Sequence, residues 1–470
     1  MFNELLLSDD QSKISLFEYL LNQNDTTFKL SNLEVDLNIS RFKLRSDIES
    51  INADLESIKQ PTLFEITSGW LYPSDRLSHQ ILQALLTIYF KRSSYYPLII
   101  ETLFSKDDFV PLKKMQENYN WTNVAYSRNK KTLLNLINKN STAGDYGSYR
   151  ILLFNILFYF NEQLVLPIDM IKTFSKIQYT FNPNNDLNKT HQISLMLSIT
   201  YYEVNNHSHF IKAEECWLTS SSKTIELGSE FSKEEDCYFT QFLMTENLFP
   251  LNEFSYTQFQ DRSKFEYIYM LTYDEISPLL LENNEPSLVK KILLIISEMI
   301  FIAQYAHDFP ETIHLLVPKT YFNEIYPSLT HALVSLFNMF KNEKLVGKND
   351  DRLFLLICAQ LVSSDLNLEN IDPVSICVDF TGGYAINEWI RCQITNFVGL
   401  NLRLKNITAE SADIYLGDFA QSNLKTEQII WTKPPTPKDW YQFGQAIVQI
   451  KRKKLSTQKT NNTSKIKPFD

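Results

Sequence analysis

Residues 30–55 have the sequence LSNLEVDLNISRFKLRSDIESINADL. Their pattern predicts a short helix over residues 31–37, with Ser31 as its N-cap, and a tight turn at residues 38–39. Ser40 is expected to cap a second helix that continues to about residue 55. Apolar residues recur on that helix at helical spacing and predict one buried face, formed by Leu44, Ile48, Ile51 and Leu55.

The first half of this second helix carries three basic residues, Arg41, Lys43 and Arg45. In a helix-turn-helix protein, that half of the recognition helix enters the DNA major groove. Arginine and lysine there pair with guanine edges or with phosphates. The alternative is that this helix pair has a purely structural role, because helix pairs with a solvated charged face are common and most of them do not bind DNA.

The neighbouring residues complete a predicted winged helix-turn-helix domain over residues 1–73. Residues 4–22 have the pattern of an amphipathic helix, and weak alternation at 64–66 and 70–72 predicts the two strands of a wing. Residues 1–60 contain 6 basic against 11 acidic residues, so only the cluster at 41–45 is locally positive.

A second helix-turn-helix pattern follows in residues 74–160. Asp107 and Asp108 are predicted to begin its first helix, residues 118–121 (NYNW) to form the turn, and Thr122 to cap its second helix. Residues 106–150 carry 8 basic against 4 acidic residues, which predicts a local phosphate-facing surface. The candidate DNA-binding residues of the two units are Ser40, Arg41, Lys43, Arg45, Thr122, Arg128, Lys130 and Lys131.

Composition limits the class of protein. A chain of 470 residues suggests several domains, and only 10 glycines argue against a glycine-rich nucleotide-binding fold and favour a mainly helical one. The net charge of −10 means that any DNA-binding surface must be local. The five cysteines form no CxxC pair, and the longest apolar runs are too short to span a bilayer. We therefore expect a cytoplasmic protein with no membrane contact, no metal and no cofactor.

Residues 161–370 consist almost entirely of helical patterns, enough for two bundles over 161–275 and 276–370. A long apolar helix is expected to lead into them from near Arg150. Six of the seven histidines lie in residues 151–370. An isolated histidine is usually a surface residue or a satisfied core residue, and no His/Cys/Asp spacing resembles a metal site. The pair His207 and His209 could bind a metal weakly, but a histidine pair in a loop is usually incidental.

Two helix-turn-helix units, the second closed by GSYR (residues 147–150) ahead of an aromatic-rich helix, resemble the Mga and AtxA group of regulators from Gram-positive bacteria. The resemblance covers nearly the whole chain and implies a DNA-binding transcriptional regulator that is not an enzyme. The central bundles are similar in position and size to the regulation domains that phosphotransferase-system proteins phosphorylate on histidine. This similarity implies phosphocarrier proteins of that system as partners, with His191 as an acceptor in the first bundle and His307 or His314 in the second.

From Ile371 onwards the predicted secondary structure changes from helical to mixed α/β. A buried strand at 373–380, a glycine turn, a helix at 385–398 and further strands at 400–404 and 412–416 predict a small α/β domain over 371–452. Its order resembles the enzyme IIB component of the phosphotransferase system, which carries a phosphoryl group on a loop cysteine. The corresponding loop here, DFTGGY (residues 379–384), has no cysteine. The resemblance therefore implies a catalytically silent module that assists dimer formation, followed by a disordered basic tail over 453–470.

The sequence as a whole predicts a mainly α, multidomain protein: a winged helix-turn-helix pair, central helical bundles and a small α/β domain. The expected partners are double-stranded DNA and a second copy of the chain. Three other interpretations remain open: an RNA-binding antiterminator, a phosphocarrier enzyme and a non-enzymatic helical scaffold. The helical pattern of residues 1–150 argues against the first, and the missing loop cysteine argues against the second.

Overall fold

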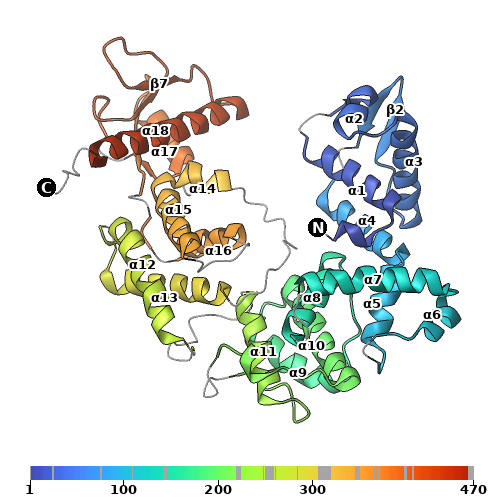
Figure 1. Ribbon diagram of the computed structural model, residues 1–470. Helices are drawn as coiled ribbons and strands as arrows, with labels where there is room; N and C mark the ends of the chain where they lie inside the picture. Colours follow the sequence, from blue (N-terminus) through green and yellow to red (C-terminus); the bar gives the residue numbers. More distant parts are fainter. Residues whose placement is uncertain are drawn as a thin grey trace. The chain divides into compact units, whose positions relative to one another are not determined.

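The computed structural model describes residues 2–23, 26–74, 77–107, 109–140, 145–218, 224–246, 248, 259, 261–282, 284–304, 319–343, 350–364, 366–368, 371–395, 400–404 and 407–463. The protein is mainly helical, with a small antiparallel sheet near its N-terminus and a small parallel sheet near its C-terminus (Figure 1). The chain divides into two compact units, one built from residues up to 250 and the other from described residues beyond 250. Each unit is described separately.

Unit 1 begins with three helices and a three-stranded antiparallel sheet in the strand order β1-β3-β2. The predicted apolar stripe is buried, since none of its four side chains is more than 1% exposed. The predicted strands at 64–66 and 70–72 are also present and pair with each other. The elements are α1 (Ser8–Leu21), β1 (Phe28–Lys29), α2 (Leu30–Asp36), α3 (Arg41–Ser57), β2 (Phe64–Thr67) and β3 (Trp70–Pro73), after a 3-10 turn at Asn3–Leu5.

The predicted role of Ser31 as an N-cap is wrong. Helix α2 starts at Leu30, so Ser31 lies inside it and Lys29 occupies the cap position. The reason is that β1 runs directly into the helix, and the backbone N–H of Leu30 donates to the carbonyl oxygen of Gly69, 3.0 Å away in the turn between β2 and β3. Sequence periodicity does not reveal this contact between segments that lie far apart in the chain.

A buried ion network joins α1 and α3 to α4 (His79–Arg92). Lys13 Nζ lies 2.8 Å from Asp10 Oδ1 and 3.3 Å from Asp54 Oδ2. Arg92 Nη1 lies 2.6 Å from the other oxygen of Asp54. The ammonium group of Lys13 also lies over the ring of Tyr89. Buried charges are stable only when they are paired in this way, so the network fixes how the three helices pack.

The second predicted helix pair consists of α6 (Leu112–Tyr119) and α7 (Asn123–Asn140), after α5 (Tyr95–Leu103). The prediction that Asp107 and Asp108 begin the first helix is wrong: α6 begins at Leu112, and Asp108 lies outside the described residues. The Thr102 hydroxyl accepts a hydrogen bond from the N–H of Val110 at 3.3 Å, and the Ser105 hydroxyl accepts one from Asp107 at 3.1 Å. These local bonds satisfy the backbone in a non-helical conformation.

The rest of unit 1 is formed by longer helices and two 3-10 turns. Helix α8 begins at Tyr146, earlier than the predicted start near Arg150, because Asp145 caps it by accepting a hydrogen bond from Ser148 N at 2.8 Å. The elements are α8 (Tyr146–Tyr159), η2 (Ile168–Met170), α9 (Ile171–Phe181), α10 (Leu187–His207), η3 (Ala213–Glu215) and α11 (Lys233–Thr245).

Arg150 of α8 forms an ion pair with Glu235 of α11, and both side chains are 0% exposed. The guanidinium group also donates to the carbonyl oxygen of His209, just after α10. One oxygen of Glu235 accepts hydrogen bonds from Arg150 Nη2 at 3.0 Å and from the N–H of Ile211 at 2.8 Å. The pair therefore joins two helices and the segment that follows a third.

We expect Arg150→Met to lower the free energy of unfolding of unit 1 by about 3–5 kcal/mol, because the variant leaves Glu235 charged and buried without a counterion. Urea denaturation, with hydrogen exchange to assign the transition to unit 1, measures this loss. Lys113→Met removes an exposed i,i+4 ion pair with Glu117 and is the matched control, with an expected loss below about 0.5 kcal/mol. Equal losses in the two variants would contradict a structural role for the buried pair.

Unit 2 begins with helices α12 (Arg262–Leu281) and α13 (Pro286–Ala303), which pack extensively against each other. It continues with α14 (Lys319–Ile325), α15 (Pro327–Asn342) and α16 (Asp350–Ser363). Glu298 of α13 is 5% exposed, and burial raises the pKa of its carboxyl group to about 8. An acid in such a site is neutral in the folded protein near neutral pH.

The raised pKa of Glu298 makes the free energy of unfolding depend on pH. Since the folded pKa lies above the ordinary value near 4.5, the unfolded chain loses the proton first, and the free energy of unfolding falls as pH rises from about 4.5 to 8. Glu298→Gln removes this dependence, so the variant should be close to the wild type in stability at pH 4.5 and more stable than it at pH 8. Thermal unfolding across that range tests this, with exposed Glu266→Gln as the control. Parallel pH profiles of wild type and Glu298→Gln would refute it.

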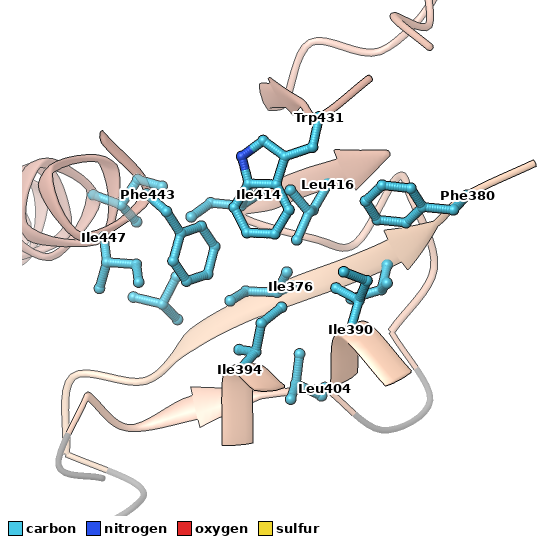
Figure 2. Packing of buried hydrophobic residues seen from close by; sticks show 13 residues of the cluster. Ile376, Phe380, Ile390, Ile394, Leu404, Ile414, Leu416, Trp431, Phe443 and Ile447 are labelled. Carbon is cyan, nitrogen blue, oxygen red and sulfur yellow. The ribbon is translucent and has the colours of Figure 1, made fainter. Parts of the chain in front are cut away.

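The C-terminal part of unit 2 is a four-stranded parallel sheet in the order β5-β4-β6-β7 with two helices. Its core gathers apolar side chains from the strands and from both helices (Figure 2). The expected strands are present, and β7 is an additional strand that the sequence did not reveal. The elements are β4 (Val374–Asp379), α17 (Tyr384–Thr395), β5 (Leu402–Arg403), β6 (Ile414–Gly417), β7 (Glu427–Ile430) and α18 (Pro437–Thr463).

The prediction of a disordered tail from residue 453 is wrong as far as Thr463, because α18 continues to that residue; residues 464–470 lie outside the described part. Two lysines of the basic run hold this helix in place. Lys451 is 1% exposed and donates to the carbonyl oxygen of Ile325 at 2.6 Å. Lys454 donates to the carbonyl oxygen of Pro373 at 2.8 Å and to Asp413 Oδ2 at 2.6 Å.

Candidate nucleic-acid interface

Helix α3 presents two arginines to solvent at its N-terminal end. Arg41 has an exposed side chain whose Nε lies 3.7 Å from Glu34 Oε1, and its guanidinium group approaches Gly69 at the tip of the β2–β3 turn. Arg45 is exposed and has no ion-pair partner in the described part of the chain. Ser40 caps the helix as predicted, since its hydroxyl accepts a hydrogen bond from Lys43 N at 3.3 Å. The N-terminal half of α3 therefore has two exposed cations.

Lys43 is arranged differently from the two arginines. Its Nζ lies 2.8 Å from Asp9 Oδ1 at the start of α1 and 2.9 Å from Asp47 Oδ1 one turn further along α3. Burial lowers the pKa of Lys43, but the hydrogen bonds to these two carboxylates outweigh burial and raise the pKa above its ordinary value. Asp47 is 1% exposed and also accepts a hydrogen bond from the Ser12 hydroxyl at 2.6 Å. Lys43 thus compensates a buried charge.

The turn between β2 and β3 lies beside α3. Ser68 and Gly69 both have positive φ, 53° and 84°, and Thr67 pairs directly with Trp70. This is the geometry of a two-residue hairpin turn of the primed type, in which glycine takes the left-handed conformation without steric cost. The turn is short and doubly fixed, because the Gly69 carbonyl oxygen also accepts the hydrogen bond from α2.

Helix α7 carries the second set of candidates (Figure 1). Thr122 caps it as predicted, with its hydroxyl accepting a hydrogen bond from Ala125 N at 3.2 Å. Arg128 and Lys131 are exposed and have no ion-pair partner within the described ranges. Lys130 is half-buried, with Nζ 4.3 Å from the ring centre of Phe109 and 5.6 Å from that of Tyr126. Cation–π contacts hold Lys130 against the protein, so Arg128 and Lys131 are the better placed cations.

The two helix pairs share a turn that sequence reasoning did not recognise. Asn38 and Asn120 each end the first helix of a pair in the left-handed conformation, with φ of 52° and 54°. Each asparagine stands two residues before the cap and four before an exposed apolar side chain, Phe42 in one pair and Val124 in the other. The pattern shared by NISRF (38–42) and NWTNV (120–124) is the sequence signal for this repeated turn.

His191, the predicted phosphorylation candidate of the first bundle, is half-buried in α10. Its Nε2 lies 2.9 Å from the carbonyl oxygen of Glu162. Because a carbonyl oxygen can only accept, Nε2 carries the proton and Nδ1 holds the free lone pair in the neutral ring. His307 and His314 lie outside the described residues.

A second group of polar side chains is buried near Arg150. His209 Nδ1 lies 2.9 Å from Glu203 Oε2, and the rings of His207 and His209 stack with centres 5.2 Å apart. Within the described ranges, no group of three or more His, Cys, Asp or Glu side chains is placed to hold a metal ion. Glu203 is 0% exposed, which places this group in the core of unit 1.

The loop after β4, where an enzyme IIB component would carry its nucleophile, has no cysteine. Asp418, which follows β6, accepts a hydrogen bond from the N–H of Thr381 at 3.1 Å and another from its hydroxyl. Cys377 lies inside β4, and burial raises the pKa of its thiol. A raised pKa keeps the thiol protonated and a poor nucleophile. All five cysteines are free.

In the part of the chain that the structure describes, no helix is both long and apolar enough to cross a membrane. The chain matches no protein-family model, and a search of curated proteins finds no similar sequence.

We expect Lys43→Met and Arg45→Met to differ in stability although both remove one cation from α3. Lys43→Met leaves buried Asp47 with only the Ser12 hydroxyl, so it should lower the free energy of unfolding by about 1–3 kcal/mol. Arg45→Met should change it by less than about 0.5 kcal/mol. Urea denaturation of the two full-length variants measures the difference. If both variants were as stable as the wild type, Lys43 would not be needed to compensate the charge of Asp47 and would be available to bind a ligand.

Proposed function

We propose that the protein is a DNA-binding transcriptional regulator whose N-terminal 150 residues hold two helix-turn-helix units. The first, with its helices, three-stranded sheet and short β2–β3 turn, is interpreted as a winged helix-turn-helix. The observation that carries the proposal is the repetition of one local geometry: an asparagine in the left-handed conformation, a Ser or Thr cap and an exposed helix start with arginine nearby. In helix-turn-helix proteins this helix start meets the base edges.

The charge distribution supports few phosphate contacts in each of the two helix-turn-helix pairs. Lys43 and Lys130 are occupied by intramolecular contacts, which leaves Arg41, Arg45 and, on α7, Arg128 and Lys131. A dimer doubles this number and raises affinity without a strongly basic chain. The proposal therefore includes self-association, to which the C-terminal α/β module contributes by analogy with the Mga and AtxA group.

The central helices are proposed to act as regulation domains of the phosphotransferase type. Of the three predicted acceptors, His191 lies within the described residues. A phosphoryl group adds a charge of about −1.5 to −2, next to a ring that now lies against Phe158 with centres 5.4 Å apart. A charge of that size beside an apolar ring disfavours the packing of His191 against Phe158. The resulting change in packing would transmit the phosphorylation state to the helices around α10.

The helical scaffold is the second candidate, and the acidic character of residues 1–60 favours it. A gel-shift titration distinguishes the two. We expect full-length protein to bind its own upstream region at low salt and to lose affinity steeply between about 50 and 200 mM salt. The double variant Arg41→Ala/Arg45→Ala should weaken binding and reduce the salt slope by about 2, roughly one for each lost phosphate contact.

The matched control is Lys172→Ala/Lys176→Ala, which removes the same charge from exposed positions on α9. Its affinity and salt slope should equal those of the wild type. An unrelated duplex separates sequence or shape readout from phosphate contact alone. If folded protein forms no complex at low salt, the scaffold is the better account.

A further inference from the structure

Two large apolar side chains extend into solvent from the starts of α3 and α7. Phe42 is 84% exposed and Val124 is 79% exposed. Single exposed apolar residues are normal on protein surfaces. These two are different because they occupy the same position in two separate helix pairs, and because neither packs on the buried face of its helix.

The equivalence of the two positions extends along both helices. Phe42 follows the cap Ser40 by two residues, as Val124 follows the cap Thr122. Further along, Leu44 corresponds to Tyr126, and both are buried. Four features thus recur at the same spacing: the asparagine, the Ser or Thr cap, the exposed apolar residue and the buried residue. The positions between them differ.

Each apolar side chain stands next to an exposed arginine. Arg45 lies three residues after Phe42, and Arg128 lies four residues after Val124, spacings that place both members of each pair on one face of the helix. Each face therefore combines one apolar group with one cation that the described residues leave without a counterion. The cation suits an anionic partner, and the apolar group requires that this partner also offers apolar surface.

We propose that Phe42 and Val124 contact thymine methyl groups in the major groove of DNA, an inference that rests on the proposed function and names what the two helices read. The C5-methyl of thymine is the apolar group that base edges present in the major groove, and apolar side chains recognise it there. The neighbouring arginine contacts a phosphate or a guanine edge. Both helices thus recognise DNA in the same way: the apolar side chain contacts a thymine, and the arginine contacts a neighbouring phosphate or guanine.

Replacing thymine by deoxyuridine tests this, because it removes the methyl group and leaves base pairing unchanged. Full-length protein first selects binding duplexes from a random-sequence pool, and each thymine of a selected duplex is then replaced in turn. Loss of one buried methyl group should weaken binding about fourfold at each thymine that is contacted. Phe42→Ala should abolish this discrimination at one set of positions and Val124→Ala at the other.

Val35→Ala is the matched control, since Val35 is 78% exposed on α2, outside the recognition helices. This variant should keep the full preference for thymine over deoxyuridine. Equal binding of thymine and deoxyuridine duplexes overturns this inference while the proposed function stands, and so does unchanged discrimination by Phe42→Ala and Val124→Ala. Failure of the protein to retain any duplex in the selection overturns both.

Discussion

The buried ion pair between Arg150 and Glu235 is the interaction on which the middle of unit 1 depends. Removing two charges from water costs several kcal/mol for each ion, and close geometry and additional hydrogen bonds must offset that cost. Here the carbonyl oxygen of His209 and the N–H of Ile211 supply those bonds. Helices α8 and α11 and the end of α10 are therefore held in one arrangement. Helix α7 packs against α8 as well as against α5 and α6, so this pair also supports the position of α7.

Helix α3 is held by a comparable arrangement of charges. Asp54 of α3 is shared by Lys13 of α1 and Arg92 of α4, and Asp47 is shared by Lys43 and Ser12. Both aspartates lie on the inner side of α3, where a helix would normally present apolar residues. The acidic composition of residues 1–60 thus has a structural cause: several acids are counterions inside the protein rather than charges on the face that we propose meets DNA.

The sequence predicted those features that depend on local periodicity. The buried stripe of α3, the caps Ser40 and Thr122 and the strands β2 and β3 follow from residue spacing and turn residues. The failures have two physical causes. Local side-chain bonds at Thr102, Ser105 and Asp145 moved the starts of α6 and α8, and contact between distant segments caused the others. Ser31 is not a cap because Gly69 satisfies Leu30, and the basic run at 451–454 is helical because Ile325, Pro373 and Asp413 bind its lysines. Among the candidate site residues, the sequence could not reveal that Lys43 is bound to Asp9.

The position of Lys43 between Asp9 and Asp47 has a consequence for how the proposed regulator would search a chromosome. A lysine that remains bound to carboxylates adds little to attraction towards phosphates of arbitrary sequence, and Asp9 brings a negative charge close to the same helix. In the proposed regulator we therefore expect residence on random DNA to be brief, and transfer between distant segments to go through solution more than by sliding along one.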